Sequence, residues 1–141
     1  MLSPYLLAIG SAWIIAQLSK VFIDRVKNQS TVNYRQLYAS GSMPSSHSAA
    51  VVALLTVIGL EGGIETGLFA LATLMAAIVM YDAVMVRRST GEQGVAIRSL
   101  IKEQKSSVRL PRAAKGHEPL EVAAGALLGL AVGLAIFFIT R

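Results

Sequence analysis

Residues 66–86 read "TGLFALATLMAAIVMYDAVMV" and contain one charged side chain, Asp82, among 21 residues. An α-helix needs about 20 predominantly apolar residues to cross the hydrocarbon core of a bilayer. Three further stretches have the same character, at Pro4 to Ile23, Pro44 to Leu60 and Leu120 to Thr140, of which Pro44 to Leu60 is the shortest. The whole chain is 54% hydrophobic, with a mean hydropathy of +0.59. The sequence therefore predicts an all-α, integral membrane helical bundle with about four transmembrane helices.

The polar segments between these spans are short. Four helices of this length leave no room for a second domain, so residues 1–141 are assigned to a single membrane-embedded domain. Within the segment after the third span, residues 92–104 read "EQGVAIRSLIKEQ" and space apolar residues at helical intervals among charges. This pattern predicts a short interfacial helix. Residues 106–116 contain Pro111 and Gly116 and are predicted to form a loop.

Positive charge is divided very unevenly along the chain. Twelve of the thirteen Lys and Arg residues lie near the end of the first span or follow the first or the third span, namely Lys20, Arg25, Lys27, Arg35, Arg87, Arg88, Arg98, Lys102, Lys105, Arg109, Arg112 and Lys115. Alternating spans place these two segments on one side, and the positive-inside rule assigns that side to the cytoplasm and both termini to the outside. The basic pI is thereby explained by topology. Membrane phosphates are the expected partners, and nucleic acid is not.

Two charged residues lie unusually deep in apolar sequence. Lys20 precedes the last apolar residues of the first span, and Asp82 lies near the inner end of the third. A carboxylate inside the membrane costs about 2.5 to 3.5 kcal/mol on insertion scales, so Asp82 should face the bundle interior and hold a partner. Lys20 and the pair Arg87 and Arg88 are the candidates for this ion pair.

Residues 41–48, "GSMPSSHS", precede the second span. Pro44 suits a first helical turn, and Ser45 or Ser46 can cap the free N–H groups of that turn. A helix N-terminus favours anions, and His47 would lie in the first turn, directed at such an anion. Taken alone, this segment favours the simpler interpretation of a helix cap with an incidental histidine.

The second histidine changes that balance. Residues 115–129, "KGHEPLEVAAGALLG", place His117 just before the last span and Glu121 four residues later. The carboxylate can then hold one imidazole nitrogen and leave the other free to act as a nucleophile. The predicted topology brings both histidines, Lys20 and Asp82 to one membrane face. Glycines at every fourth position further along, Gly125, Gly129 and Gly133, predict close helix packing.

Lys20, "MPSSHSA" at residues 43–49 and "GHEPLEV" at residues 116–122 together resemble the three motifs of the type-2 phosphatidic acid phosphatase superfamily, which is related to vanadium haloperoxidases. The chain resembles most closely the small divergent branch of that superfamily, nearly from end to end. The resemblance implies that His117 is the nucleophile, Glu121 its orienting carboxylate, His47 the acid for the leaving group and Lys20 a phosphate ligand.

The chain also departs from the superfamily pattern. Ser46 stands where the wider family has Gly, no Arg-Pro follows Lys20, and Pro111 occupies the place of the third motif's Arg. Arg87 and Arg88 are therefore the expected phosphate-binding arginines, together with Ser45 and Ser46. Further candidates for binding phosphate are other basic residues of the same two segments: Arg35, Arg109, Arg112 and Lys115.

These observations predict a membrane lipid phosphatase of the bacterial-type plasma membrane. It would hydrolyse a phosphomonoester through a phosphohistidine at the cytoplasmic face, with phosphatidylglycerophosphate or phosphatidate as substrate. No metal or other cofactor is implied, because the chain has two histidines and no cysteine. The alternatives are an inactive lipid-binding or scaffold protein and a polyprenyl phosphate or diphosphate phosphatase. A transporter is disfavoured, because few polar residues lie at the midplane of the predicted spans. The sequence leaves open whether the protein forms a homo-oligomer.

Overall fold

The computed structural model describes residues 3–28, 43–111 and 116–141. These residues form α1 (Pro4–Asn28), α2 (Ser46–Gly62), α3 (Gly67–Tyr81), the π-helical turn η2 (Asp82–Val86), α4 (Arg87–Glu103) and α5 (Pro119–Thr140). No strand occurs among them. Three helices are long and apolar enough to cross a membrane, and α2 is a shorter apolar helix. The prediction of an all-α membrane bundle with about four spans is confirmed.

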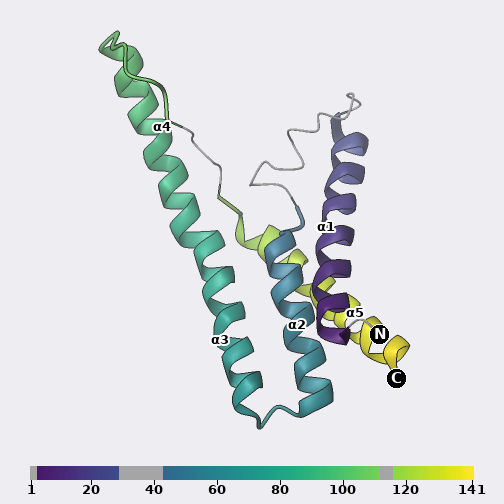
Figure 1. The fold of residues 1–141 in the computed structure, drawn as a ribbon. Helices are drawn as coiled ribbons and strands as arrows, with labels where there is room; N and C mark the ends of the chain where they lie inside the picture. Colours follow the sequence, from purple (N-terminus) through teal and green to yellow (C-terminus); the bar gives the residue numbers. More distant parts are fainter. Residues whose placement is uncertain (1–2, 29–42, 112–115) are drawn as a thin grey trace.

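The bundle is held together by small side chains, because without water between them helices gain most from close van der Waals contact. Ala8, Ala12 and Ala16 of α1 are fully buried in one cluster with Ala49 and Ala53 of α2. Helix α2 therefore lies at the centre of the bundle, where it contacts α1, α3 and α5, and Figure 1 shows it between α1 and α3.

The predicted glycine packing is confirmed where α5 contacts α2. A Cβ atom added at Gly125 would lie 2.4 Å from the carbonyl oxygen of Ser45. One at Gly129 would lie 2.3 Å from the carbonyl oxygen of Ala49, and one at Gly133 2.7 Å from Cβ of Thr56. Only glycine lets the backbones of α2 and α5 approach this closely.

The third span and the helix after it differ from the prediction, which separated them by a loop. Helices α3 and α4 are continuous. They join through η2 into one helix that runs on past the rest of the bundle (Figure 1). The predicted helix over residues 92–104 thus exists as most of α4, but no loop precedes it. The first turns of α4 contain no proline, and side-chain pairs such as Arg88 with Glu92 stabilise them.

The chain topology gathers four helix ends at one end of the bundle. The last turns of α1, the first turn of α2, η2 and the first turn of α5 lie there, whereas both termini and the turn at residues 63–66 lie at the opposite end (Figure 1). Side chains far apart in sequence can therefore meet at that first end.

Candidate active site

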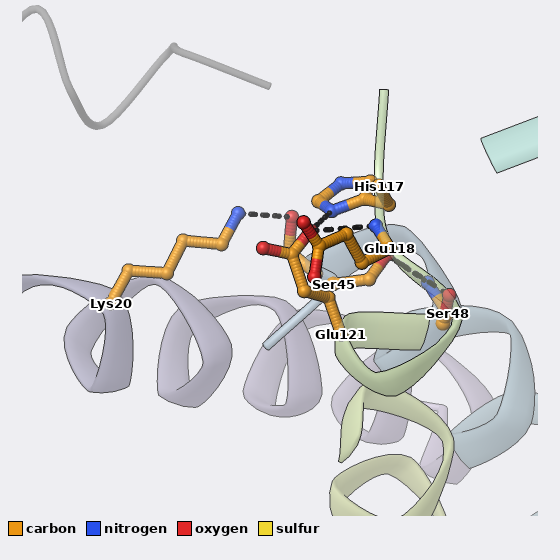
Figure 2. Close-up of polar contacts among 7 residues, drawn as sticks. Lys20, Ser45, Ser48, His117, Glu118 and Glu121 are labelled. Carbon is orange, nitrogen blue, oxygen red and sulfur yellow. Dashed lines mark hydrogen bonds and ion pairs between the residues drawn. The ribbon is translucent and has the colours of Figure 1, made fainter. Parts of the chain in front are cut away.

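His117 is held by the first turn of α5. Glu118 is the N-cap and forms a capping box with Glu121, and Pro119 occupies the first helical position. The same Glu121 carboxylate accepts from the backbone N–H of Glu118 at 3.1 Å and lies 2.8 Å from Nδ1 of His117 (Figure 2). The predicted spacing of four residues thus brings imidazole and carboxylate together. An Nδ1–H that donates to Glu121 leaves Nε2 as the unprotonated nitrogen.

The backbone before α5 is held by the long helix. The His117 N–H donates to the carbonyl oxygen of Ala83, inside η2, at 3.1 Å. Gly116 lies so close to α4 that an added Cβ would be 2.4 Å from Cα of Arg88. These contacts bury His117, whose exposed fraction is 5%. Its ring position is therefore set by two helices, α5 and the η2–α4 segment.

The first turn of α2 lies beside this pair. Ser45 is the N-cap, and its hydroxyl accepts from the Ser48 hydroxyl at 2.9 Å and from the Ser48 N–H at 3.4 Å. The backbone N–H of Ser45 donates to the carbonyl oxygen of Glu121 at 3.0 Å. Ser45 and Ser48 have no exposed surface. This start of α2 is thus bonded directly to the start of α5.

Lys20 reaches the same place from α1. Its Nζ donates to the hydroxyl of Ser46 at 3.4 Å, and both residues are buried (Figure 2). Lysines near the end of a span usually extend toward the membrane surface. Lys20 turns into the bundle instead, so its cationic end lies in the same group of side chains as Glu121 and His117.

His47 and His117 line one small cavity. Its walls are formed by Ser45, His47, Val79, Ala83, Arg87 and His117. His47 is exposed, in contrast to His117. The cavity has a volume of about 10 Å³, room for one water molecule, and two histidines and one arginine line it. These are residue types that bind anions.

Asp82 finds its partner in Arg87. Oδ2 of Asp82 accepts from Nε of Arg87 at 2.6 Å, while Lys20 contacts Ser46. The two residues are five apart, which would put them on different faces of an α-helix, but a π turn closes on the fifth residue and superposes them. The side chain of Asp82 is 36% exposed and that of Arg87 is 53% exposed. Asp82 is therefore half-buried, and it does not face the bundle interior, contrary to the prediction.

Arg88 lies on another surface. It pairs with Glu92 at 3.2 Å and lines a second pocket of about 570 Å³, which His117 also lines. The remaining lining residues are Gly91, Glu92, Val95, Gly116 and Glu118. Among the further candidates for binding phosphate, Arg109 is exposed and lines neither pocket. The other three, Arg35, Arg112 and Lys115, lie outside the described residues. Within the described ranges, no group of three or more His, Cys, Asp or Glu residues could hold a metal ion.

Three parts of the site were missed by the sequence reasoning. Ser48 carried a signal, because a hydroxyl three residues after an N-cap serine lies close to that cap. Gly116 was interpreted only as a loop residue, although a glycine beside a functional residue also marks close backbone approach. The π turn that presents the Ala83 carbonyl had no sequence signal, since its residues are ordinary helix formers.

Comparison with known proteins gives two matches. A family model described as "Divergent PAP2 family" matches residues 2–132. The chain is 39% identical over 150 residues to "Uncharacterized membrane protein YuiD" of Bacillus subtilis (strain 168), and the match covers 94% of each chain. No solved structure matches.

Proposed function

The chain belongs to the divergent PAP2 family, and from this premise we propose that it is a membrane lipid phosphatase acting on a phosphomonoester through a phosphohistidine. One observation carries the proposal. His117 has Nδ1 bonded to Glu121, while its ring lines the same cavity as His47 and Arg87. A nucleophile, an acid and a cation for phosphate are thus next to one another.

The reaction proceeds in two steps. Nε2 of His117 attacks phosphorus in line, the bond between phosphorus and the ester oxygen breaks, and His47 gives its proton to the leaving oxygen. Water then attacks the phosphohistidine and gives a proton to His47, and the phosphorus–nitrogen bond breaks. Inorganic phosphate leaves, the imidazole of His117 is restored and His47 is again the protonated acid. Glu121 stabilises the positive charge that His117 acquires when it attacks, and it keeps the ring oriented.

Positive groups around the cavity stabilise the charge on the transferred phosphoryl group. Lys20 and Arg87 supply cations from α1 and α4, and the first turn of α2 adds backbone N–H groups next to Ser46. Arg88, which lines the second pocket, is a further candidate for stabilising this charge.

The substrate head group is expected at the cytoplasmic leaflet, on the side assigned to the basic segments. Phosphatidylglycerophosphate and phosphatidate, both phosphomonoesters, suit a single nucleophile with one leaving-group acid. Two alternatives predict different outcomes. A polyprenyl phosphate or diphosphate phosphatase would prefer prenyl substrates, and an inactive lipid-binding protein would hydrolyse none.

The test is phosphate release by the protein purified in detergent, assayed against phosphatidylglycerophosphate, phosphatidate, a polyprenyl phosphate and a polyprenyl diphosphate. We expect turnover of phosphatidylglycerophosphate or phosphatidate in preference to both prenyl substrates, and we expect His117→Ala to abolish turnover and to trap no phosphoenzyme. Ser99→Ala is the control, because this exposed hydroxyl of α4 bonds only to its own helix at Val95. Full activity of His117→Ala, or no activity of the wild-type protein on any substrate, would contradict the proposal.

A further inference from the structure

Two neighbouring arginines begin α4, and the structure gives them different surroundings. Arg87 lines the small cavity, which His47 and His117 also line. Arg88 pairs with Glu92 on its own helix and lines the second pocket. The two side chains have the same chemistry, so only their placement can decide which of them binds a phosphate. Arg87 is the residue on which the π turn η2 closes.

Arg87 is hydrogen-bonded twice to Asp82, the first residue of η2. Its backbone N–H donates to the carbonyl oxygen of Asp82, which is the five-residue step of a π turn. Its Nε donates to Oδ2 of Asp82 at 2.6 Å. In an uninterrupted α-helix, two residues five apart would point about 140° away from each other. The π turn therefore brings the carboxylate within hydrogen-bond distance of the guanidinium group.

This ion pair contributes little to stability. Both side chains are partly exposed, and ion pairs at such sites are weak because water screens the charges. Asp82 nevertheless follows directly on the apolar run of α3, where a carboxylate is costly to insert into a membrane and usually serves a function. A role in holding Arg87 in one orientation accounts for a carboxylate at this position.

The form of the bond fits this role. Asp82 accepts from Nε, so the bond does not use the terminal nitrogens Nη1 and Nη2 of Arg87. These two nitrogens carry most of the N–H groups of a guanidinium, in a flat fork that matches the oxygens of a phosphate. The same π turn also holds the proposed nucleophile, because the Ala83 carbonyl accepts from the His117 N–H at 3.1 Å. One turn therefore sets the position of Arg87 relative to His117.

We infer that Asp82 is a positioning residue that directs the Arg87 guanidinium toward the phosphate of the substrate, and that Arg87 rather than Arg88 is the phosphate-binding arginine. The kinetic part of this inference rests on the proposed phosphatase function, whereas the geometric part does not. Without the carboxylate, the guanidinium can turn about its side-chain bonds, and each phosphate that binds must first order it again. Loss of Asp82 should therefore weaken phosphate binding and leave the fold intact.

The kinetic test is a double-mutant cycle of Asp82→Ala and Arg87→Ala, measured as kcat/KM for the best lipid phosphate of the panel above. Arg87→Ala should lower kcat/KM on the order of a hundredfold, the cost of removing one group that stabilises transition-state charge. Asp82→Ala should lower it about tenfold, the cost of ordering one long side chain. Asp82→Ala should have no further effect in the Arg87→Ala background, because Asp82 acts through Arg87. Losses that multiply in the double variant would overturn the inference.

Two further variants separate the charge of Asp82 from its size and Arg87 from Arg88. Asp82→Asn keeps the size and one acceptor oxygen, so it should fall between wild type and Asp82→Ala. Glu92→Gln is the matched control, because Glu92 holds Arg88 by an exposed pair on the same helix. It should leave the inhibition constant of inorganic phosphate as in wild type, whereas Asp82→Ala should raise this constant about tenfold. An increase in Glu92→Gln as large as in Asp82→Ala would overturn the inference.

A binding test needs no activity. NMR of protein labelled with ¹⁵N-arginine shows the Nε–H signals, and Arg87→Lys and Arg88→Lys identify those of the two residues. The Arg87 signal should be protected from exchange with water in the wild type, lose this protection in Asp82→Ala, and shift when inorganic phosphate is added. A shift of the Arg88 signal instead, or protection of Arg87 that survives in Asp82→Ala, would overturn the inference. A wild-type protein that shows the expected Arg87 signals but hydrolyses no lipid phosphate would refute the proposed function and leave the positioning of Arg87 standing.

Discussion

The two histidines differ in how the protein holds them. His117 is buried, with one ring nitrogen at a carboxylate and its backbone N–H bonded to the Ala83 carbonyl. His47 is exposed at the first turn of α2 and lines the cavity that both rings share. A nucleophile must approach phosphorus along a fixed line, whereas an acid needs only to reach the leaving oxygen. Their environments therefore agree with the roles proposed for them.

His47→Ala tests this division of roles. If His47 is the leaving-group acid, its loss should reduce turnover of a lipid phosphate by about a hundredfold to ten-thousandfold. The same variant should lose much less activity on an aryl phosphate, because a good leaving group needs little proton donation. The measurement is kcat/KM for both substrates in wild type and variant. An equal loss on every leaving group would leave His47 without the proposed role.

At the scale of elements, the joint between α4 and the segment before α5 sets the position of His117. The long helix contributes the Ala83 carbonyl from its π turn, and Gly116 lets the following segment lie against the backbone of Arg88. π turns are rare and are often found at functional sites, where they shift the hydrogen-bond ladder of a helix. Here η2 provides a contact for His117 and also brings Arg87 over Asp82.

Gly116→Ala should push the segment before α5 away from α4. The added Cβ would be 2.4 Å from Cα of Arg88, and a backbone atom cannot yield as a flexible side chain can. We expect His117 to be displaced and phosphate release to fall on the order of a hundredfold, the cost associated with a shift of about 1 Å. Gly10→Ala is the control, because nothing lies within 4 Å of a Cβ added there. Wild-type activity of Gly116→Ala would show that this contact does not position the nucleophile.

At the scale of the whole molecule, the site is assembled from four helix ends. Lys20 comes from the last turns of α1, His47 from the start of α2, Arg87 from the start of α4, and His117 from the residues before α5. The bundle brings these residues to one end, from which the basic helix α4 continues. The opposite end holds the turn at residues 63–66, which has no Lys or Arg.

Cysteine labelling tests the orientation of this molecule in the membrane. The natural chain has no cysteine, so Gly63→Cys and Ser106→Cys each introduce a single thiol. The positive-inside rule predicts that a membrane-impermeant reagent added to sealed cells labels position 63 and not position 106. Permeabilised cells, in which both should react, provide the control. Labelling of both positions from outside would contradict the topology and with it the cytoplasmic site.

The sequence by itself determined the properties that depend on local spacing. Long apolar runs identified a membrane bundle because crossing lipid requires a fixed length of helix. The interval of four residues placed Glu121 beside His117, and glycines at the same interval marked the face of α5 that packs on α2. Each of these features lies within one helix or in the residues directly before it, so local sequence was sufficient to predict it.

Only the tertiary structure decided which groups meet between helices. Lys20 bonds to Ser46 because α1 packs against α2. The bond from the Ser45 N–H to the Glu121 carbonyl oxygen depends on how closely Gly125 lets α5 approach α2. These contacts depend on the register and separation of helices distant in sequence, and a local pattern carries no information about either.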